Sequence, residues 1–301
     1  MYDQVAQNKR RSALLIVAFA LFTALVLAVV AYAFGFGMPG VALAIVLAGG
    51  SSFLSYWKSD SIALAASRAK PADPDEYARL HNLVEGLCIA SGLPKPRLYI
   101  IEDDAPNAFA TGRNPRHAAV AVTTGLLEKL NRVELEGVLA HELSHVKNYD
   151  ILVGTLAVTM VGVLALLADL SFRFMWLSGH RRSSSNDNAG PQAILAVVGI
   201  VLLILAPIAA RMMHFAVSRR RESLADFSGV EMTRYPPGLI SALEKLKADQ
   251  TVVRSGSRAT AHMWIEDPMP QKKADGNLSK LNRWFNTHPP LDERIAALRE
   301  L

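Results

Sequence analysis

The chain has 301 residues, 51% of them hydrophobic, and a mean hydropathy of +0.21. That composition is too apolar for an ordinary soluble domain, and the chain is too long for a lone membrane anchor, so we expect a membrane part joined to a water-facing domain. The net charge of +5 comes from scattered basic residues, which argues against a nucleic-acid-binding protein.

The first long uncharged stretch predicts a membrane hairpin. No charged residue occurs from Ser12 to Trp57, and a span needs about 20 apolar residues. The stretch is therefore long enough for two spans, roughly 12–34 and 40–57. Glycines and a proline in residues 35–40 predict the turn between them.

The soluble segment that follows is expected to hold strands. RLYIIE (97–102) and AAVAVTT (118–124) have the β-branched and aromatic content of strands, and they flank the stretch PNAFATG (106–112). Cys88 lies before them in an apolar run, so a buried core thiol is predicted. As the only cysteine, it excludes an internal disulfide.

The motif His-Glu-x-x-His predicts a metal site on a helix. His141 and His145 are four residues apart, so on a helix both imidazoles lie on one face and can share one ion. Glu142 lies on a neighbouring face, where it can reach a metal-bound water and take its proton. The alternative is a surface helix with stray histidines, but this spacing rarely arises by chance in a chain with 8 histidines.

Two further uncharged runs, 151–168 and 193–210, predict a third and a fourth span. The first of these runs begins directly after the His-Glu-x-x-His region, so we expect that helix to continue almost straight into the third span. Lys147 and Asp150 would then mark the boundary that faces water. The metal ligands should converge within a few residues of the membrane face.

Basic residues near the span ends predict the orientation. Those on one side are Lys9, Arg10, Arg11, Lys58, Lys147, Arg219, Arg220 and Arg221. We therefore place both termini and both large soluble segments in the cytosol. Arg173, Arg181 and Arg182 fall on the other side and are the exception to this scheme.

A carboxylate pair after the fourth span offers a third metal ligand. Glu222 and Asp226 are four residues apart and share one helical face. One of the two can bind the metal while the other accepts the N–H of a ligating histidine. The spacing leaves open which does which, and a solvated charged helix beside a membrane is the alternative.

The C-terminal region adds two polar candidates and a loop. His288 precedes two prolines and an amphipathic helix that carries Arg294. A histidine and an arginine presented in this way can stabilise an oxyanion, and a structural role is the alternative. Residues 250–282 are polar, Gly-rich and Lys-rich in places, which suggests a mobile loop that covers the site.

Three motifs in order resemble one protein family. HELSH (141–145), ESLAD (222–226) and HPPLDER (288–294), with the predicted spans before and between them, resemble HtpX-type membrane zinc metalloproteases. These are bacterial relatives of the CAAX prenyl endopeptidases. PNAFATG (106–112) and VAVTTGLL (120–127) match as well, so the resemblance covers nearly the whole chain.

The resemblance implies a zinc site and a catalytic base. One Zn2+ ion per chain would be held by His141, His145 and Glu222, with Glu142 as general base. Asp226 matches the position that orients a ligand histidine.

The resemblance also implies roles outside the metal ligands. His288 and Arg294 match catalytic positions thought to steady the transition state or the fold around it. Asn107, Ala108 and Phe109 match the edge strand along which an extended peptide substrate binds. Main-chain hydrogen bonds at such an edge hold a peptide whatever its sequence.

The expected fold is an α-helical integral membrane protein with four transmembrane helices and an α+β, zincin-like (gluzincin) cytosolic protease domain. Its predicted parts are a basic N-terminus (1–11), a transmembrane hairpin (12–57), the first protease half (58–150), the third and fourth spans (151–217) with an outer loop at about 178–192, and the second protease half (218–301).

The implied function is a zinc endopeptidase of the bacterial plasma membrane that cleaves misfolded or damaged membrane proteins from the cytosolic side. Its expected partners are membrane-protein or peptide substrates and the lipid bilayer, without nucleic acid. One alternative is a prenyl-protein (CAAX) endopeptidase, which has more spans and a larger chamber. Another is a non-catalytic, zinc-bearing membrane scaffold, and the intact Glu142 argues against it.

Overall fold

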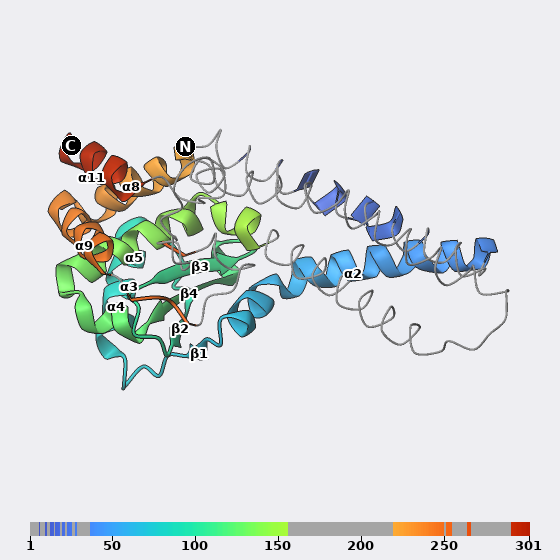
Figure 1. Ribbon diagram of the computed structural model, residues 1–301, viewed down its shortest axis with the longest axis horizontal. Coiled ribbons are helices and arrows are strands. Elements are labelled where there is room, and N and C mark those ends of the chain that lie inside the picture. Colours follow the sequence, from blue (N-terminus) through green and yellow to red (C-terminus); the bar gives the residue numbers. More distant parts are fainter. Residues whose placement is uncertain are drawn as a thin grey trace, which may run out of the picture.

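The computed structural model describes residues 37–155, 219–249, 251–254, 264–265 and 290–301, with isolated helical residues between 6 and 28. Figure 1 shows one long helix, α2 (Gly37–Ala66), that projects from a body of shorter helices around a small sheet. The body contains strands β1 (Lys70–Pro71), β2 (Arg97–Ile101), β3 (Ala108–Gly112) and β4 (Ala118–Thr123), the 3-10 helix η1 (Pro115–His117), and helices α3 (Ala78–Ser91), α4 (Thr124–Lys129), α5 (Arg132–Lys147), α8 (Arg219–Thr233), α9 (Pro236–Ala248) and α11 (Leu291–Arg299).

The sheet has the order β1-β2-β4-β3, with β2 and β4 parallel and β3 antiparallel to β4. The two strands expected from the sequence are confirmed, and the stretch between them forms β3 at the edge of the described sheet. The helices and this mixed sheet fit the α+β character expected for the body.

Both faces of the sheet are covered by hydrophobic residues. Successive side chains of a strand point to opposite faces, so neighbouring residues join different clusters. Ile100 joins the main core, which includes residues of α3, α5 and α9. Ile101 and Phe109 join a second cluster on the other face, together with Leu64 of α2 and Trp264. Cys88 is buried in the main core as expected, and burial raises the pKa of its thiol to about 11.

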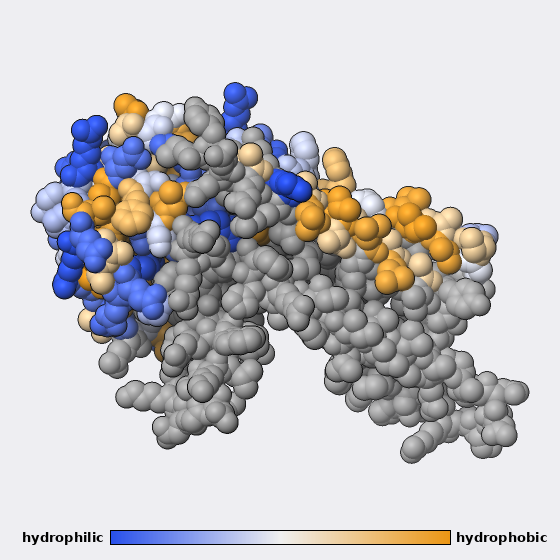
Figure 2. Space-filling view, turned by 90° about the horizontal axis from the view of Figure 1, so that it is seen from above, coloured by the Kyte–Doolittle hydropathy of each residue, from blue (hydrophilic) through white to orange (hydrophobic). Residues whose placement is uncertain are grey.

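Helix α2 exposes much of its apolar surface where it leaves the body. Its exposed large hydrophobic residues are Met38, Leu43, Ile45, Val46, Leu47, Phe53, Leu54, Trp57 and Ile62. Figure 2 shows mainly apolar side chains along this projecting part, whereas hydrophilic and hydrophobic residues are mixed on the visible surface of the body. Near its C-terminal end α2 is tied to the body by an ion pair between Asp60 and Arg97, and Arg113 stacks over the Trp57 ring at 4.3 Å.

The predicted spans map onto the structure only in part. Residues 40–57 lie inside α2, which continues without a break past Lys58 to Ala66. Among the described residues, no helix combines the length and the apolarity needed to cross a membrane. The other three predicted spans lie almost entirely outside the described residues, so the four-span topology stays a prediction.

Helix α5 begins at a capping box. The Asn131 side chain accepts hydrogen bonds from the N–H groups of Val133 and Glu134, both at 3.0 Å, and the Glu134 carboxylate accepts from the Asn131 N–H at 2.8 Å. The same carboxylate accepts from Ser241 and Lys245 of α9, both at 2.7 Å. The capping box therefore sets the residue at which α5 begins, and the Glu134 contacts hold that end of the helix against α9.

The end of α5 differs from the expected straight run. The helix stops at Lys147, and Tyr149 adopts a left-handed backbone conformation with φ of 60°. The chain is helical again from Asp150 to Thr155 after this turn. Asp150 was expected to face water at a boundary, but it is buried, with 7% of its surface exposed. The expectation of a continuous helix was wrong because a non-glycine left-handed residue leaves little trace in a sequence pattern.

A glycine lets α5 and α9 pack closely, which gives a first prediction. A Cβ on Gly137 would lie 2.8 Å from the backbone N of Leu239 and 2.9 Å from its Cα. Such a contact forces the two helices apart, so we expect Gly137→Ala to lower the free energy of unfolding by about 1–3 kcal/mol. Thermal unfolding of the full chain in detergent measures the effect.

The matched control is Gly86→Ala on the exposed side of α3. A Cβ there meets nothing within 4 Å, so the usual helix preference for alanine should raise stability by roughly 0.5–1 kcal/mol. Equal melting temperatures for the Gly137 variant and the unmodified chain would contradict the packing argument.

Candidate metal centre

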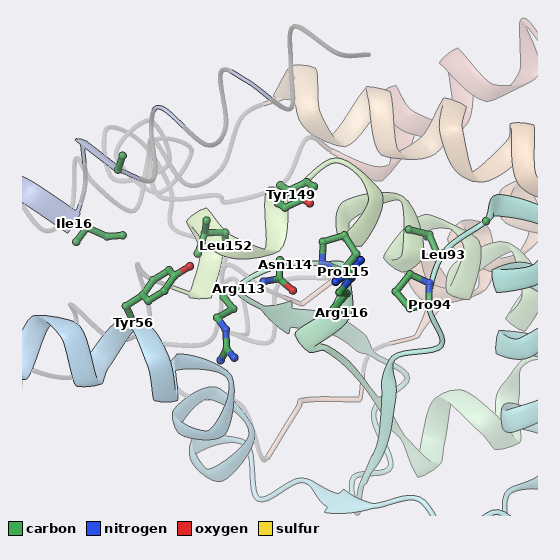
Figure 3. Close-up of a pocket in the computed structure, with 12 residues that line it drawn as sticks. Ile16, Tyr56, Leu93, Pro94, Arg113, Asn114, Pro115, Arg116, Tyr149 and Leu152 are labelled. Carbon is green, nitrogen blue, oxygen red and sulfur yellow. The ribbon is translucent and has the colours of Figure 1, made fainter.

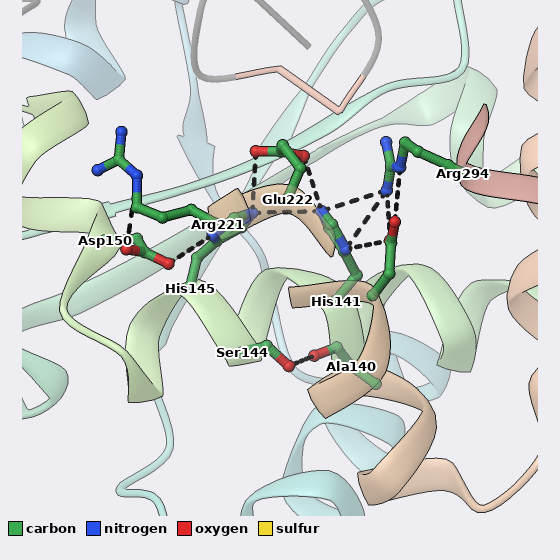
Figure 4. Close-up of polar contacts among 9 residues, drawn as sticks. Ala140, His141, Ser144, His145, Asp150, Arg221, Glu222 and Arg294 are labelled. Carbon is green, nitrogen blue, oxygen red and sulfur yellow. Dashed lines mark hydrogen bonds and ion pairs between the residues drawn. The ribbon is translucent and has the colours of Figure 1, made fainter. Parts of the chain in front are cut away.

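Three ligand-type side chains from two helices meet at one point. His141 and His145 come from α5 and Glu222 comes from α8, with one ligand atom of each within 4.8 Å of the others. The two Nε2 atoms are 3.2 Å apart. The Glu222 oxygens lie 3.7 Å from Nε2 of His141 and 3.6 Å from Nε2 of His145 (Figure 4).

These distances fit a metal ion. Zinc binds histidine nitrogen and carboxylate oxygen at about 2.0–2.1 Å, which puts two ligands of a tetrahedral ion about 3.3 Å apart. The three pairs in this cluster are close to that spacing. Two imidazoles and one carboxylate are also the donor set of known catalytic zinc sites, in which a fourth position stays open.

The two helices can approach because of Gly229 on α8. A Cβ at this position would lie 3.0 Å from the backbone N of His141 and 3.2 Å from its Cα. A larger residue would therefore press against the backbone that carries the first histidine. This contact brings Glu222, on the same helix, within reach of both imidazoles.

Asp226 lies behind His141 and fixes its orientation. Its Oδ1 is 2.9 Å from Nδ1 of His141. Because an ionised carboxylate only accepts hydrogen bonds, Nδ1 carries the proton and Nε2 presents its lone pair to the other ligands. The spacing alone left open which of Glu222 and Asp226 binds metal, and the family resemblance implied Glu222. The geometry puts Glu222 among the ligand atoms and Asp226 behind a histidine.

Arg294 of α11 holds Asp226 from the other side. Its Nε donates to Oδ2 at 2.9 Å and its Nη2 donates to Oδ1 at 2.7 Å, while Nη2 also lies 3.4 Å from Nδ1 of His141. Burial raises the pKa of Asp226, but the charge of Arg294 and the hydrogen bond with His141 lower it to about 2 overall. The carboxylate therefore stays ionised across the physiological range.

His145 has a carboxylate partner of its own, which the sequence did not suggest. Its Nδ1 is 3.2 Å from Oδ2 of Asp150, and Oδ1 of Asp150 is 3.9 Å from Nε of Arg221. Burial lowers the pKa of His145, but the Asp150 hydrogen bond and the charges of Glu222 and Asp150 raise it to about 9. Arg221 was expected near the end of the fourth span as a basic residue at the membrane boundary. In the structure its side chain is buried.

The structure gives less information on the other three catalytic candidates, Glu142, Arg294 and His288. Glu142 is 2% exposed on α5, and its charge helps to raise the pKa values of His145 and Arg294, so it lies near the cluster. Arg294, for which an oxyanion role and a structural role were both open, binds Asp226 beside the first histidine, and its catalytic role stays a prediction. His288 lies outside the described residues, and its role stays a prediction.

The expected substrate residues lie on β3 and just before it. Asn107, Ala108 and Phe109 are at most 1% exposed. The Ala108 carbonyl accepts a hydrogen bond from the Ile265 N–H at 3.0 Å, and the Phe109 ring packs edge-on against Trp264, with centroids 4.9 Å apart. A short piece of the predicted 250–282 loop thus packs on the strand edge. Only 251–254 and 264–265 of that loop lie within the described residues.

A large pocket lies away from these ligands. It has a volume of about 970 Å³ and opens between α2, η1 and the turn after α5, with Tyr56, Arg113, Arg116, Tyr149 and Leu152 among its lining (Figure 3). None of the three candidate ligands lines it. The candidate active site is therefore located by the three ligand side chains and not by this pocket.

Comparison with known proteins identifies the family. A family model described as peptidase family M48 matches residues 74–301. The chain belongs to peptidase family M48. It is a metalloprotease, and the family resemblance expected from the motifs is confirmed.

Relatives with similar sequences match this chain over nearly its whole length. The chain is 42% identical over 303 residues to a protease HtpX homolog of Caldanaerobacter subterraneus subsp. tengcongensis, covering 100% of this chain and 98% of that protein. It is 40% identical to a protease HtpX homolog of Streptococcus gordonii, covering 100% of both. The crystal structure of S. mikatae Ste24p aligns with 99% of this chain and 67% of that chain, at 18% identity and a TM-score of 0.46.

The raised pKa of His145 predicts how metal affinity changes with pH. Below about pH 9 the metal-free imidazole carries an extra proton that zinc must displace, and above that pH it does not. We expect the zinc dissociation constant to fall about tenfold per pH unit from about pH 7 to the pKa and then to level off. Competition with a chelator of known protonation measures this, and an affinity that is constant from about pH 7 to 8.5 would contradict it.

Proposed function

We propose that this metalloprotease is a zinc-dependent endopeptidase of the membrane, which hydrolyses peptide bonds of misfolded or damaged membrane proteins at the cytosolic face. The observation that carries the proposal is the convergence of His141, His145 and Glu222, with Glu142 buried on the same helix as the two histidines. A metal ion follows from the family and the cluster together, and zinc is proposed from the donor set.

The residues around the ion have distinct tasks in hydrolysis. A bound zinc ion supplies Lewis acidity, which lowers the pKa of water and polarises the scissile carbonyl. Glu142 takes the proton of the attacking water and then passes it to the leaving amine. Asp226 keeps His141 in the tautomer that binds metal, and Arg294 keeps Asp226 ionised. His288 remains the proposed stabiliser of negative charge on the substrate.

The edge of β3 is the proposed site for the substrate backbone. The Asn107 carbonyl accepts from Thr123 of β4 at 3.0 Å, whereas the Ala108 carbonyl faces the other way and accepts from Ile265. Backbone groups alternate in an antiparallel pair, so Ala110 faces the same outer side as Ala108. A peptide that adds to this edge at Ala108 competes with Ile265, and one that adds at Ala110 extends the pairing.

The membrane location draws on α2. Its exposed apolar residues between Leu43 and Leu54 form a surface of the kind that lipid covers, and Trp57 and Lys58 follow where an interface would be. Together with the apolar runs of the sequence, this surface supports insertion, and the basic residues near the predicted span ends support a metal centre on the cytosolic side. Substrates that leave the bilayer beside the spans would then reach the site directly.

The role of Glu142 is tested by an isosteric change. We expect Glu142→Gln to keep the fold and zinc but to lower the cleavage rate of an unfolded membrane-protein substrate by about 10²–10⁴-fold, because the amide cannot accept the proton. The matched control is Glu136→Gln, the same change on the same helix outside the ligand cluster, which should cleave at the normal rate. Equal cleavage by both variants would rule out this mechanism.

The substrate class is tested with two peptides of one sequence. The proposed function predicts that a plain peptide is cleaved as fast as its C-terminally prenylated form, because recognition runs through the backbone at a strand edge. Steady-state kinetics in the same detergent measure both. Cleavage of the prenylated form alone would favour the CAAX endopeptidase alternative.

A further inference from the structure

We infer that Asp150 is a positioning residue that orients the second metal ligand and links it to the helix that supplies the third. The inference rests on the proposed metal centre and deepens it. It concerns Asp150 and Arg221, neither of which is a metal ligand or the general base, and their contact with the ligand His145.

The first step is the contact between Asp150 and His145. Oδ2 of Asp150 lies 3.2 Å from Nδ1 of His145, and the carboxylate is 7% exposed. A carboxylate at this position keeps the proton on Nδ1 and leaves Nε2 for the metal. The arrangement repeats that of Asp226 and His141, so each ligand histidine has a carboxylate behind it.

The second step is the turn that places this carboxylate. Helix α5 stops at Lys147, and Tyr149 takes a left-handed conformation, which is unfavourable for a non-glycine residue. The turn carries the chain back, so that Asp150 lies against the last turn of the helix it has just left. In a continuous helix, position 150 would lie about 140° around the axis from His145, so its side chain would point away from the imidazole.

The third step is the link to α8. Oδ1 of Asp150 lies 3.9 Å from Nε of Arg221, whose side chain is also buried, and Arg221 directly precedes Glu222 in the chain. Figure 4 shows the row from Arg221 through Asp150 to His145, with Glu222 on the far side of the imidazole. One carboxylate thus connects a ligand of α5 with the neighbour of the ligand from α8.

The test uses the full chain in detergent, stripped of metal, with zinc alone as the probe. We expect Asp150→Ala to weaken zinc binding by about 10–100-fold and Asp150→Asn, which keeps the shape but loses the charge, to fall between. Cobalt(II) in place of zinc gives visible absorption bands that report ligand geometry, and these should change in both variants. If a variant only lost stability, the fraction that stays folded and binds cobalt would keep the unmodified band positions.

The matched control is Asp249→Ala at the end of α9. This carboxylate is partly buried, pairs with Lys129 at 2.6 Å and lies outside the ligand cluster. Its loss should lower stability and leave zinc affinity and the cobalt spectrum unchanged.

The link to α8 is tested by a double variant. Arg221→Gln should weaken zinc binding by less than Asp150→Ala, and the double variant should bind no more weakly than Asp150→Ala alone. Losses that simply add would show that the two side chains act independently, and this would overturn the link. If Asp150→Ala does not fold, the Asp150→Asn and Arg221→Gln variants and their double variant decide in its place.

The outcomes separate this inference from the proposed function. If the unmodified chain does not bind zinc, the metal centre itself is wrong. If the unmodified chain binds zinc tightly and both Asp150 variants match it in affinity and cobalt spectrum, the metal centre stands and the positioning role of Asp150 is overturned.

Discussion

The metal centre depends on the close packing of α8 against α5. His141 and His145 belong to one helix and Glu222 to the other, so the distance between the helices sets the distance between the ligands. Gly229 permits that distance, since even a methyl group there would lie 3.0 Å from the backbone N of His141. Metal–ligand bonds of about 2.0–2.1 Å leave little tolerance, and a small outward shift of α8 would remove the carboxylate from the site.

Charge imposes a second constraint on the same place. Four carboxylates and two guanidinium groups are buried around the two histidines: Glu142, Asp150, Glu222, Asp226, Arg221 and Arg294. The carboxylates exceed the guanidinium groups by two negative charges, and a buried excess of that kind is costly unless a cation balances it. A divalent metal ion would do so. The same negative charge raises the pKa of the His145 imidazole, through the hydrogen bond with Asp150 and the charges of Glu222, Asp150 and Glu142.

The sequence predicted the parts of the site that follow from local spacing. The His-Glu-x-x-His helix, the strands on both sides of β3 and the pairing of Glu222 with Asp226 on one face are short-range patterns with fixed geometry. The spacing alone could not say which carboxylate binds the metal, because that depends on how α8 lies against α5; the assignment of Glu222 came from the family resemblance.

Two further features escaped prediction for related reasons. An oxyanion role and a structural role were both open for Arg294, and its contact with Asp226, a residue far away in the chain, could not be derived from spacing. Asp150 was taken for a boundary residue because only the left-handed turn at Tyr149 brings it to His145. Both cases involve contacts or backbone states that no periodic pattern records.

The order of the ligands along the chain joins the metal centre to the predicted membrane part. The α5 ligands end shortly before residues 151–217, in which the third and fourth spans are predicted, and Glu222 follows shortly after. Closing a long loop costs entropy that grows only with the logarithm of its length, so helix packing and the metal ion can hold the two ends together. If the two spans also lie side by side in the bilayer, they shorten the effective loop. The membrane would then favour assembly of the metal centre as well as the delivery of substrate.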